Sequence, residues 1–148
     1  MGKRPGVRRR GRGGMQFRAA TTYKLKPAKY PSFPLEDEHI GDIIDLVHES
    51  GRDAPLAKVR FENGSISFIP APLGTRVGQR LNFGLNSEII DGNVISIQNI
   101  PDGTIVCNVE QQFGDGGALM KSAGADATVF SHADDGVILK LASGKFKK

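Results

Sequence analysis

Tryptophan is absent from this 148-residue sequence, and cysteine occurs once, at Cys107. A single cysteine excludes an internal disulfide framework and any zinc site that needs several cysteine ligands. No apolar run approaches the roughly 18 residues of a membrane span, and the basic N-terminus lacks the apolar segment of a secretory signal. We therefore expect a reduced, intracellular chain. Cys107 lies in an apolar run without a neighbouring base, which favours a buried structural thiol over a nucleophile.

Acidic residues are also absent from the first 35 positions, and this absence polarises the chain. Residues 1–29 contain ten lysines or arginines, whereas all sixteen acidic residues lie between Glu36 and Asp135. Six basic residues share that middle stretch, and four lysines follow from Lys140 to the end, so the formal charge runs from +10 through −10 to +4. An unopposed cationic arm on an acidic body favours a polyanionic partner, of which nucleic acid is the most abundant.

The basic arm has no hydrophobic period of either kind and is interrupted by five glycines before position 15. Such a segment cannot bury enough apolar surface to order itself, so we expect it to be disordered alone. Pro27, Pro31 and Pro34 predict a stiff, extended connector. Phe17 and Tyr23, interleaved with the cations, favour a segment that orders on nucleic acid over a localisation signal or a solubilising tail. Composition leaves RNA and DNA equally open.

The body is predicted to be all-β, because nineteen glycines and eight prolines accompany short apolar runs of period two. The strongest local signal is Asn63-Gly64 between two alternating runs, which predicts a hairpin. Residues 39–47 fit a helix or a bulged strand, and their β-branched content favours the strand. About five short strands are expected between residues 39 and 99, a number typical of a small Greek-key barrel. The expected strands are residues 39–47, 56–61, 66–69, 80–84 and 94–97.

A second β unit is expected after the turn Pro101-Asp102-Gly103. Its predicted strands are residues 104–109, 127–130 and 137–141, with the start of a fourth at residues 145–148. Three strands and part of a fourth do not close a barrel. We therefore expect an unpaired sheet edge after Leu141 and poor order in this unit without a partner.

A glycine-rich loop, Gly114 to Gly124, separates two of these strands. It superficially resembles a phosphate-binding P-loop, but Met120 occupies the position before Lys121-Ser122 where that motif requires glycine, so a nucleotide site is rejected. The small residues suit either close approach of the backbone to a sugar–phosphate chain, with Lys121 supplying charge, or a tight turn. The residues alone favour neither.

The remaining polar residues indicate no catalytic or metal site. His39, His48 and His132 lack metal-ligand spacing and are expected at turns or on the surface. The acidic cluster formed by Glu36–Glu38, Asp42 and Asp45 is interpreted as a solvated face or as counter-charge for the arm. We predict no enzymatic activity, no cofactor and no metal.

Three phrases of the sequence are more specific: Ser-Gly-Arg-Asp-Ala-Pro-Leu-Ala-Lys-Val at 50–59, Ile-Pro-Asp-Gly-Thr-Ile-Val-Cys-Asn-Val-Glu at 100–110, and Gly-Asp-Gly-Gly-Ala-Leu-Met-Lys-Ser-Ala-Gly at 114–124. In this order and spacing, with the basic start, they resemble the family of universal large-subunit ribosomal protein two, in its archaeal and eukaryotic branch. The resemblance covers essentially the whole chain.

The resemblance implies an oligonucleotide-binding (OB) barrel followed by an SH3-like barrel, with extended termini that thread into large-subunit ribosomal RNA near the peptidyl-transferase region. It implies a cytoplasmic, structural role that stabilises this RNA and supports subunit association. The implied partners are ribosomal RNA, other ribosomal proteins and the C-terminal part of the same protein. Family members continue beyond residue 148, so the second barrel is expected to be incomplete at its C-terminus. The alternative is a free-standing OB-type single-strand binder or RNA chaperone.

The predicted organisation is an arm at residues 1–35, an OB barrel at 36–100 and an SH3-like barrel at 101–148. In the first barrel a Gly/Pro-rich bend keeps Arg52 and Lys58 out of the core, and we expect both to bind RNA. The full set of predicted RNA-binding residues is Lys3, Arg4, Arg8, Arg9, Arg10, Arg12, Arg18, Lys24, Lys26, Lys29, Arg52, Lys58, Gly116, Gly117, Lys121, Ser122, Gly124, Lys145 and Lys147.

Overall fold

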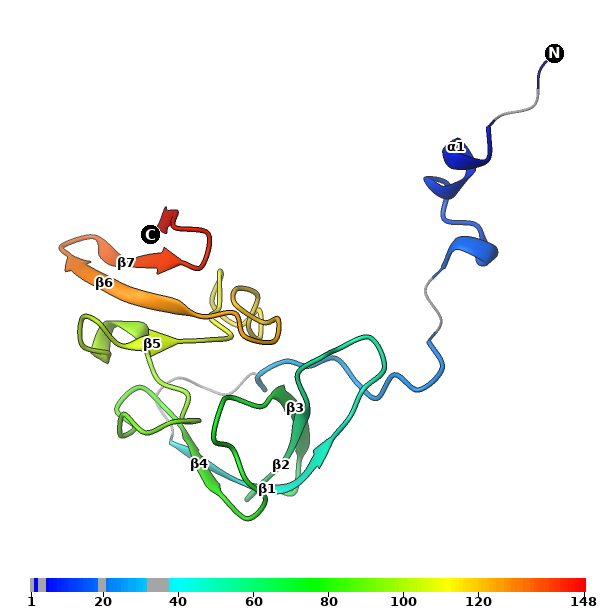
Figure 1. The fold of residues 1–148 in the computed structure, drawn as a ribbon. Coiled ribbons are helices and arrows are strands. Elements are labelled where there is room, and N and C mark those ends of the chain that lie inside the picture. The colour runs from blue at the N-terminus through cyan, green and yellow to red at the C-terminus, as the bar shows by residue number, and fades with distance from the viewer. Residues whose placement is uncertain (1, 3–4, 19–20, 32–37) are drawn as a thin grey trace.

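Two four-stranded antiparallel sheets, one above the other, make up the body of the protein (Figure 1). The computed structural model describes residues 2, 5–18, 21–31 and 38–148, and of Arg8 and Arg9 it describes only the backbone. Lys3 and Arg4 of the predicted set, Pro34, and Glu36 and Asp37 of the acidic cluster lie outside the described residues. The predicted all-β class is confirmed, and the two sheets are consistent with an OB-type unit followed by an SH3-like unit.

The first sheet has the strand order β3-β2-β1-β4. Its strands are β1 (His39–Val47), β2 (Leu56–Phe61), β3 (Ile66–Pro70) and β4 (Arg80–Phe83). The register of β1 on β2 shifts between Ile43 and Asp45, so β1 is the predicted bulged strand. The Asn63-Gly64 hairpin is confirmed, with Gly64 at a φ of 77°. Alternate side chains of all four strands form the first core, which contains Ile43, Ala57, Val59, Phe61, Ile69, Leu81 and Phe83.

The predicted strand at residues 94–97 is wrong. Val94 makes a single parallel bridge to Phe83 at the edge of the first sheet and packs on the first core. Ile95 and Ile97 pack on the second core, and a turn of 3₁₀ helix (Ile97–Asn99) follows. The chain leaves the sheet here because consecutive apolar residues serve two different cores. The first unit therefore has four strands and a bridge.

The second sheet has the order β5-β6-β7-β8. Its strands are β5 (Ile105–Val106), β6 (Ala127–Ala133), β7 (Gly136–Leu141) and β8 (Phe146–Lys147). β5 is shorter than predicted because Asn108, at a φ of 50°, turns the chain out of the extended conformation. The predicted edge after Leu141 is wrong, since β7 pairs with β8 and the edge lies one strand further on.

The second core gathers around Ile100, Val129 and Leu139, with Ile95 and Ile97 packed against it. Apolar residues before Pro101 thus contribute to the second unit. The division of the chain at residue 100 stays a prediction.

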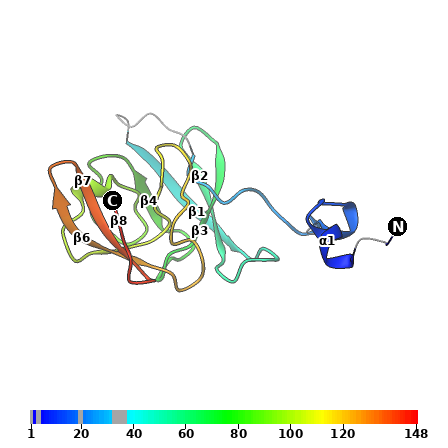
Figure 2. The same ribbon diagram turned by 90° about the horizontal axis from the view of Figure 1, so that it is seen from above.

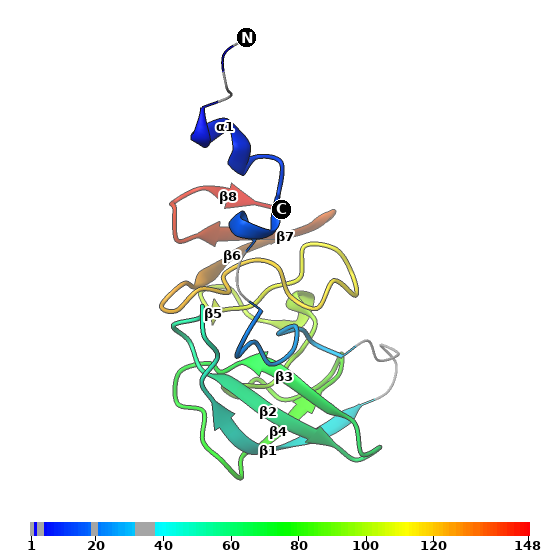
Figure 3. The same ribbon diagram turned by 90° about the vertical axis from the view of Figure 1, so that its right-hand side faces the viewer.

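The arm leaves the body and projects from it (Figures 1 and 2). It contains a five-residue helix, α1 (Gly6–Arg10), and a 3₁₀ turn (Met15–Phe17), where the sequence predicted no element. Nearer the body, residues 24–30 run between the two stacked units (Figure 3). None of the helices in the described ranges is long and apolar enough to cross a membrane.

Candidate nucleic-acid interface

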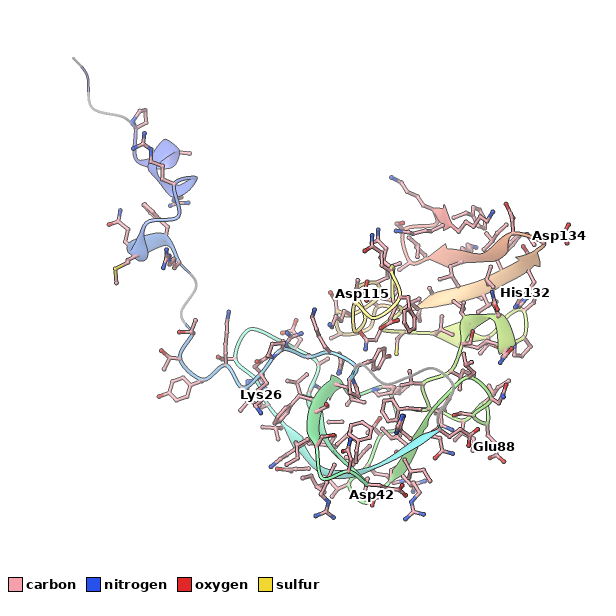
Figure 4. The ribbon with its side chains drawn as sticks, turned by 180° about the vertical axis from the view of Figure 1, so that it is seen from behind. Lys26, Asp42, Glu88, Asp115, His132 and Asp134 are labelled. Atoms are coloured by element: carbon pink, nitrogen blue, oxygen red, sulfur yellow. The ribbon has the colours of Figure 1, made fainter. Side chains whose placement is uncertain are left out.

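Residues 24–30, here called the anchor segment, hold the arm on the body. Leu25 donates its backbone N–H to the carboxylate of Glu49 at 3.1 Å. The N–H of Lys29 donates to the carbonyl of Phe68 in the first unit, and that of Tyr30 to the carbonyl of Gly116 in the second. Two consecutive residues therefore bond to different units. Figure 4 shows Lys26 where the arm meets the body and Asp115 on the loop above it.

Buried side chains reinforce the anchor segment. Ala28 is 2% exposed, and the Tyr30 ring packs edge-on to Phe83 with the centroids 6.5 Å apart. Burial raises the pKa of the Tyr30 phenol, although the neighbouring Asn108 amide acts in the opposite direction. This part of the predicted connector is thus built into the core.

Lys121 closes the junction from the second unit. Its ammonium donates hydrogen bonds to the carbonyl of Ala28 and, at 2.8 Å, to that of Gly117. Burial lowers the pKa of Lys121, and the cations Arg52 and Lys29 lower it further. Two of its three N–H donors are therefore used inside the protein.

The glycines of the loop approach the chain's own atoms. A Cβ at Gly116 would lie 2.6 Å from the Cβ of Lys29, and one at Gly117 would overlap the amide of Asn108. Both glycines are buried and have positive φ. Gly124, in contrast, has open space beside it. Glycine is thus needed at position 116 because the anchor segment passes close to it. The sequence alone did not indicate this need, because Lys29 lies far away in the chain.

The first half of the loop also uses its own backbone donors. The carboxylate of Asp115 accepts the N–H groups of Gln111, Gln112 and Gly117, and that of Glu110 accepts those of Gly114 and Gly116. Desolvation alone would raise the pKa of Asp115, but the N–H groups of Gln111, Gln112 and Gly117 hold this pKa below its usual value. Donors already paired with carboxylates are not available to a phosphate, so the open part of the loop is Ser122–Gly124.

Glu49 and Arg52 hold the anchor segment on the first unit. Glu49 is 4% exposed and accepts hydrogen bonds from Leu25 N–H and from the Arg52 guanidinium. Burial alone would raise the pKa of Glu49, but the guanidinium and the N–H together lower it. Arg52 thus pairs with Glu49 across one turn of chain.

Two grooves follow the junction and meet at Gly51 and Arg52. One, of about 560 Å³, lies between the anchor segment and residues 49–52. The other, of about 210 Å³, is lined by residues 51–54 of the first unit and by Lys121, Ser122 and Ala123 of the second. The structure therefore brings together two phrases that lie about sixty residues apart. The predicted site residues that line the grooves are Lys24, Lys26, Arg52, Lys121 and Ser122.

The other predicted residues whose side chains the structure describes do not line these grooves. Arg10, Arg12 and Arg18 are exposed on the projecting arm, and Lys58 is half-buried on β2. Lys145 and Lys147 lie at β8, at the far edge of the second sheet. The predicted set is thus divided between arm, junction and sheet edge.

The prediction that Cys107 is buried is wrong, because its side chain is exposed. Val106 packs on the second core, so its neighbours in the chain, Ile105 and Cys107, face outward. Partial desolvation and the nearby Asp126 raise the pKa of the thiol.

The histidines and carboxylates form no metal centre in the described residues, where no three of the ligand types His, Cys, Asp and Glu converge. Nδ1 of His132 lies 2.7 Å from the carboxylate of Asp102, and His48 is exposed. Asp42, in the predicted acidic cluster, pairs with Arg80 at 3.3 Å. Asp42 is therefore paired with a cation of the body, not with one of the arm.

These features define a class: a two-unit all-β protein with a cationic extension anchored where the units meet. A family model described as "Ribosomal Proteins L2, C-terminal domain" matches residues 90–148. Large ribosomal subunit protein uL2 of Cenarchaeum symbiosum is 71% identical over 146 residues, 99% of this chain and 60% of the relative. The protein of the same name from Nitrosopumilus maritimus is 71% identical over 147 residues, with the same coverage.

A more distant relative, the uL2 protein of Korarchaeum cryptofilum, is 45% identical over 147 residues and has the same coverage of 99% and 60%. The resemblance drawn from the three phrases is confirmed: over nearly its whole length the chain is similar to archaeal large ribosomal subunit proteins uL2, and residues 90–148 match the family model. It spans about 60% of the length of the curated relatives it matches.

Proposed function

We propose that this chain is a structural, non-enzymatic protein of the cytoplasmic large ribosomal subunit, which binds and stabilises large-subunit ribosomal RNA near the peptidyl-transferase region and supports subunit association. Ribosomal RNA, other ribosomal proteins and the remaining part of the family's polypeptide are its partners. The observation that carries the proposal is the anchored arm: its cations project from a fixed point at the junction of the units. Relatives named as large-subunit proteins support the same role.

The proposed RNA surface consists of the projecting arm and the two grooves. Lysines and arginines on the arm neutralise phosphates, which supplies affinity without reading sequence. In the grooves, Lys24, Lys26 and the free edge of Arg52 present cations beside the small residues Gly51, Ser122 and Ala123. Lys121, Gly116 and Gly117 contribute indirectly, because they hold the anchor segment in place.

Salt dependence of binding tests the arm. If about six of its ten basic residues reach phosphates, log K should fall with log salt at a slope of about −4 to −5. Deleting residues 2–18 removes seven of the ten cations and leaves the anchor segment intact, so the slope should flatten to about −1 to −2. A matched variant replaces those seven residues by glutamine at unchanged length. An unchanged slope in both variants would place the binding site on the body and contradict the proposal.

The location within the ribosome needs a separate test. The chain should incorporate into large subunits reconstituted from an archaeal ribosome, and nucleotides cross-linked to it should map to large-subunit RNA around the peptidyl-transferase region. Cross-links confined to the small subunit would overturn the assignment. The alternative of a free-standing OB-type binder has little base-stacking surface on the first sheet, because Phe61 and Phe83 are buried in the first core and Phe68 is half-buried.

A further inference from the structure

A row of exposed side chains crosses the outer face of the second sheet. In register, Ile105 pairs with Thr128, Thr128 with Lys140, and Lys140 with Phe146. Partners that face one another across strands project on the same side of the sheet. The opposite side carries Val129 and Leu139 of the second core. The row therefore lies on the solvent side and contributes nothing to the core.

Two aromatic rings meet on this face. Phe130 and Phe146 are 55% and 57% exposed, and their rings pack edge to face with the centroids 4.9 Å apart. Phe130 stands at the bulge of β6, where the register shifts between Val129 and Ser131. Because Val129 before it faces the core, Phe130 projects on the outer face, where its ring meets that of Phe146 on β8. The two rings are thus positioned by the sheet and by each other while much of their surface stays open.

A lysine accompanies the rings. Lys140 lies directly opposite Phe146 and projects on the same side of the sheet. Lys148, two residues beyond Phe146, pairs with Asp135 at the β6–β7 turn, so that carboxylate is neutralised. Exposed aromatics beside a lysine match single-stranded nucleic acid, which offers a base to stack and a phosphate to neutralise. The centre of a protein–protein interface is instead depleted of lysine.

We propose that the outer face of the second sheet is a second RNA site, at which Phe130 and Phe146 stack on unpaired bases and Lys140 contacts an adjoining phosphate. This inference rests on the proposed function and adds a base-dependent site to the phosphate-dependent arm.

The test compares two fluorescent RNA dodecamers, oligoadenylate and an abasic strand of equal charge, in binding to the full chain. The double variant Phe130→Leu/Phe146→Leu keeps the apolar surface but removes both rings, and should weaken oligoadenylate binding about tenfold. Binding of the abasic strand should stay within about twofold, since its phosphates see the same lysines. Phe113→Leu, at an exposed phenylalanine just before the glycine-rich loop, is the matched control and should change neither affinity.

Restoring the rings as Phe130→Tyr/Phe146→Tyr should return oligoadenylate binding to the wild-type level. Equal losses on both strands, or no loss on oligoadenylate, would overturn the stacking site; the latter is the result expected if the rings serve a protein partner. Salt-dependent binding of wild type that is identical for both strands would overturn the stacking site and leave the proposed function standing. Failure of wild type to bind either strand would contradict both.

Discussion

Lys121 donates a hydrogen bond to the backbone carbonyl of Ala28, a residue 93 positions earlier in the chain. The contact joins the second unit to the anchor segment, which is bonded to the first unit through Lys29 and Phe68. A side chain that sequence reasoning assigned to phosphate binding thus uses two of its donors to hold the protein together. Its effect on RNA is to fix the point from which the arm projects.

Replacing Lys121 by methionine should lower the free energy of unfolding by about 1.5–3 kcal/mol, the range for hydrogen bonds with a charged partner. Methionine keeps most of the apolar stem and removes the three donors. Urea unfolding measures the change. Lys145→Met, at an exposed lysine, removes the same charge and should alter stability by less than about 0.5 kcal/mol. Equal effects of the two substitutions would show that the hydrogen bonds of Lys121 contribute nothing specific.

Alanine substitution separates backbone strain from steric overlap in the glycine loop. Gly116 and Gly124 have similar φ values of 79° and 69°, but only Gly116 faces a close neighbour. Gly124→Ala should cost about 1–2 kcal/mol from the left-handed backbone alone. Gly116→Ala should cost a further 1–3 kcal/mol, roughly the range for overpacking a filled site. Thermal unfolding of both variants measures these costs. Similar losses of stability in the two variants would mean that the Lys29 side chain moves aside without cost.

Acid should release the anchor segment through Glu49. Its pKa is lowered in the folded protein, so its contribution to stability is complete above the unfolded value of about 4.3 and is lost as the pH falls through the folded value. Glu49→Gln should be less stable than wild type at pH 7, and the difference should shrink below about pH 4. Urea unfolding across this range measures it, and exchange of the Leu25 amide reports the local release. A difference that stays constant with pH would exclude Glu49 as the titrating group.

Arg52 and Lys58 were both predicted from the sequence to bind RNA, but their substitution by glutamine should have different effects on stability. Arg52→Gln removes the partner of a buried carboxylate and should lower the melting temperature. Lys58 makes no ion pair with the residues that the structure describes, so Lys58→Gln should leave the melting temperature almost unchanged and reduce the salt slope of RNA binding by about 0.7–0.9. Loss of RNA affinity in Arg52→Gln without any thermal change would restore the original prediction for both residues.

Local patterns in the sequence predicted most of the sheets. The Asn63-Gly64 turn gave the first hairpin, period-two runs gave the central strands, and the charge asymmetry identified the arm. Each of these signals is carried by residues close together in the chain, where turn geometry and side-chain alternation act directly on the backbone. The phrases around Arg52 and Lys121 were recognised for the same reason, as short runs of residues.

Only the tertiary structure decided which of these residues meet. The strand expected at 94–97 fails because Val94 and Ile95 serve different cores, and Cys107 is exposed because Val106 takes the inward position. The role of Lys121 depends on a carbonyl group, which every residue possesses and which leaves no mark in the sequence. Alternation and charge are properties of neighbouring residues, whereas the junction is made by backbone groups brought together from three distant segments. The sequence therefore determined the elements and the cationic arm, and the packing of the two units determined where that arm is held.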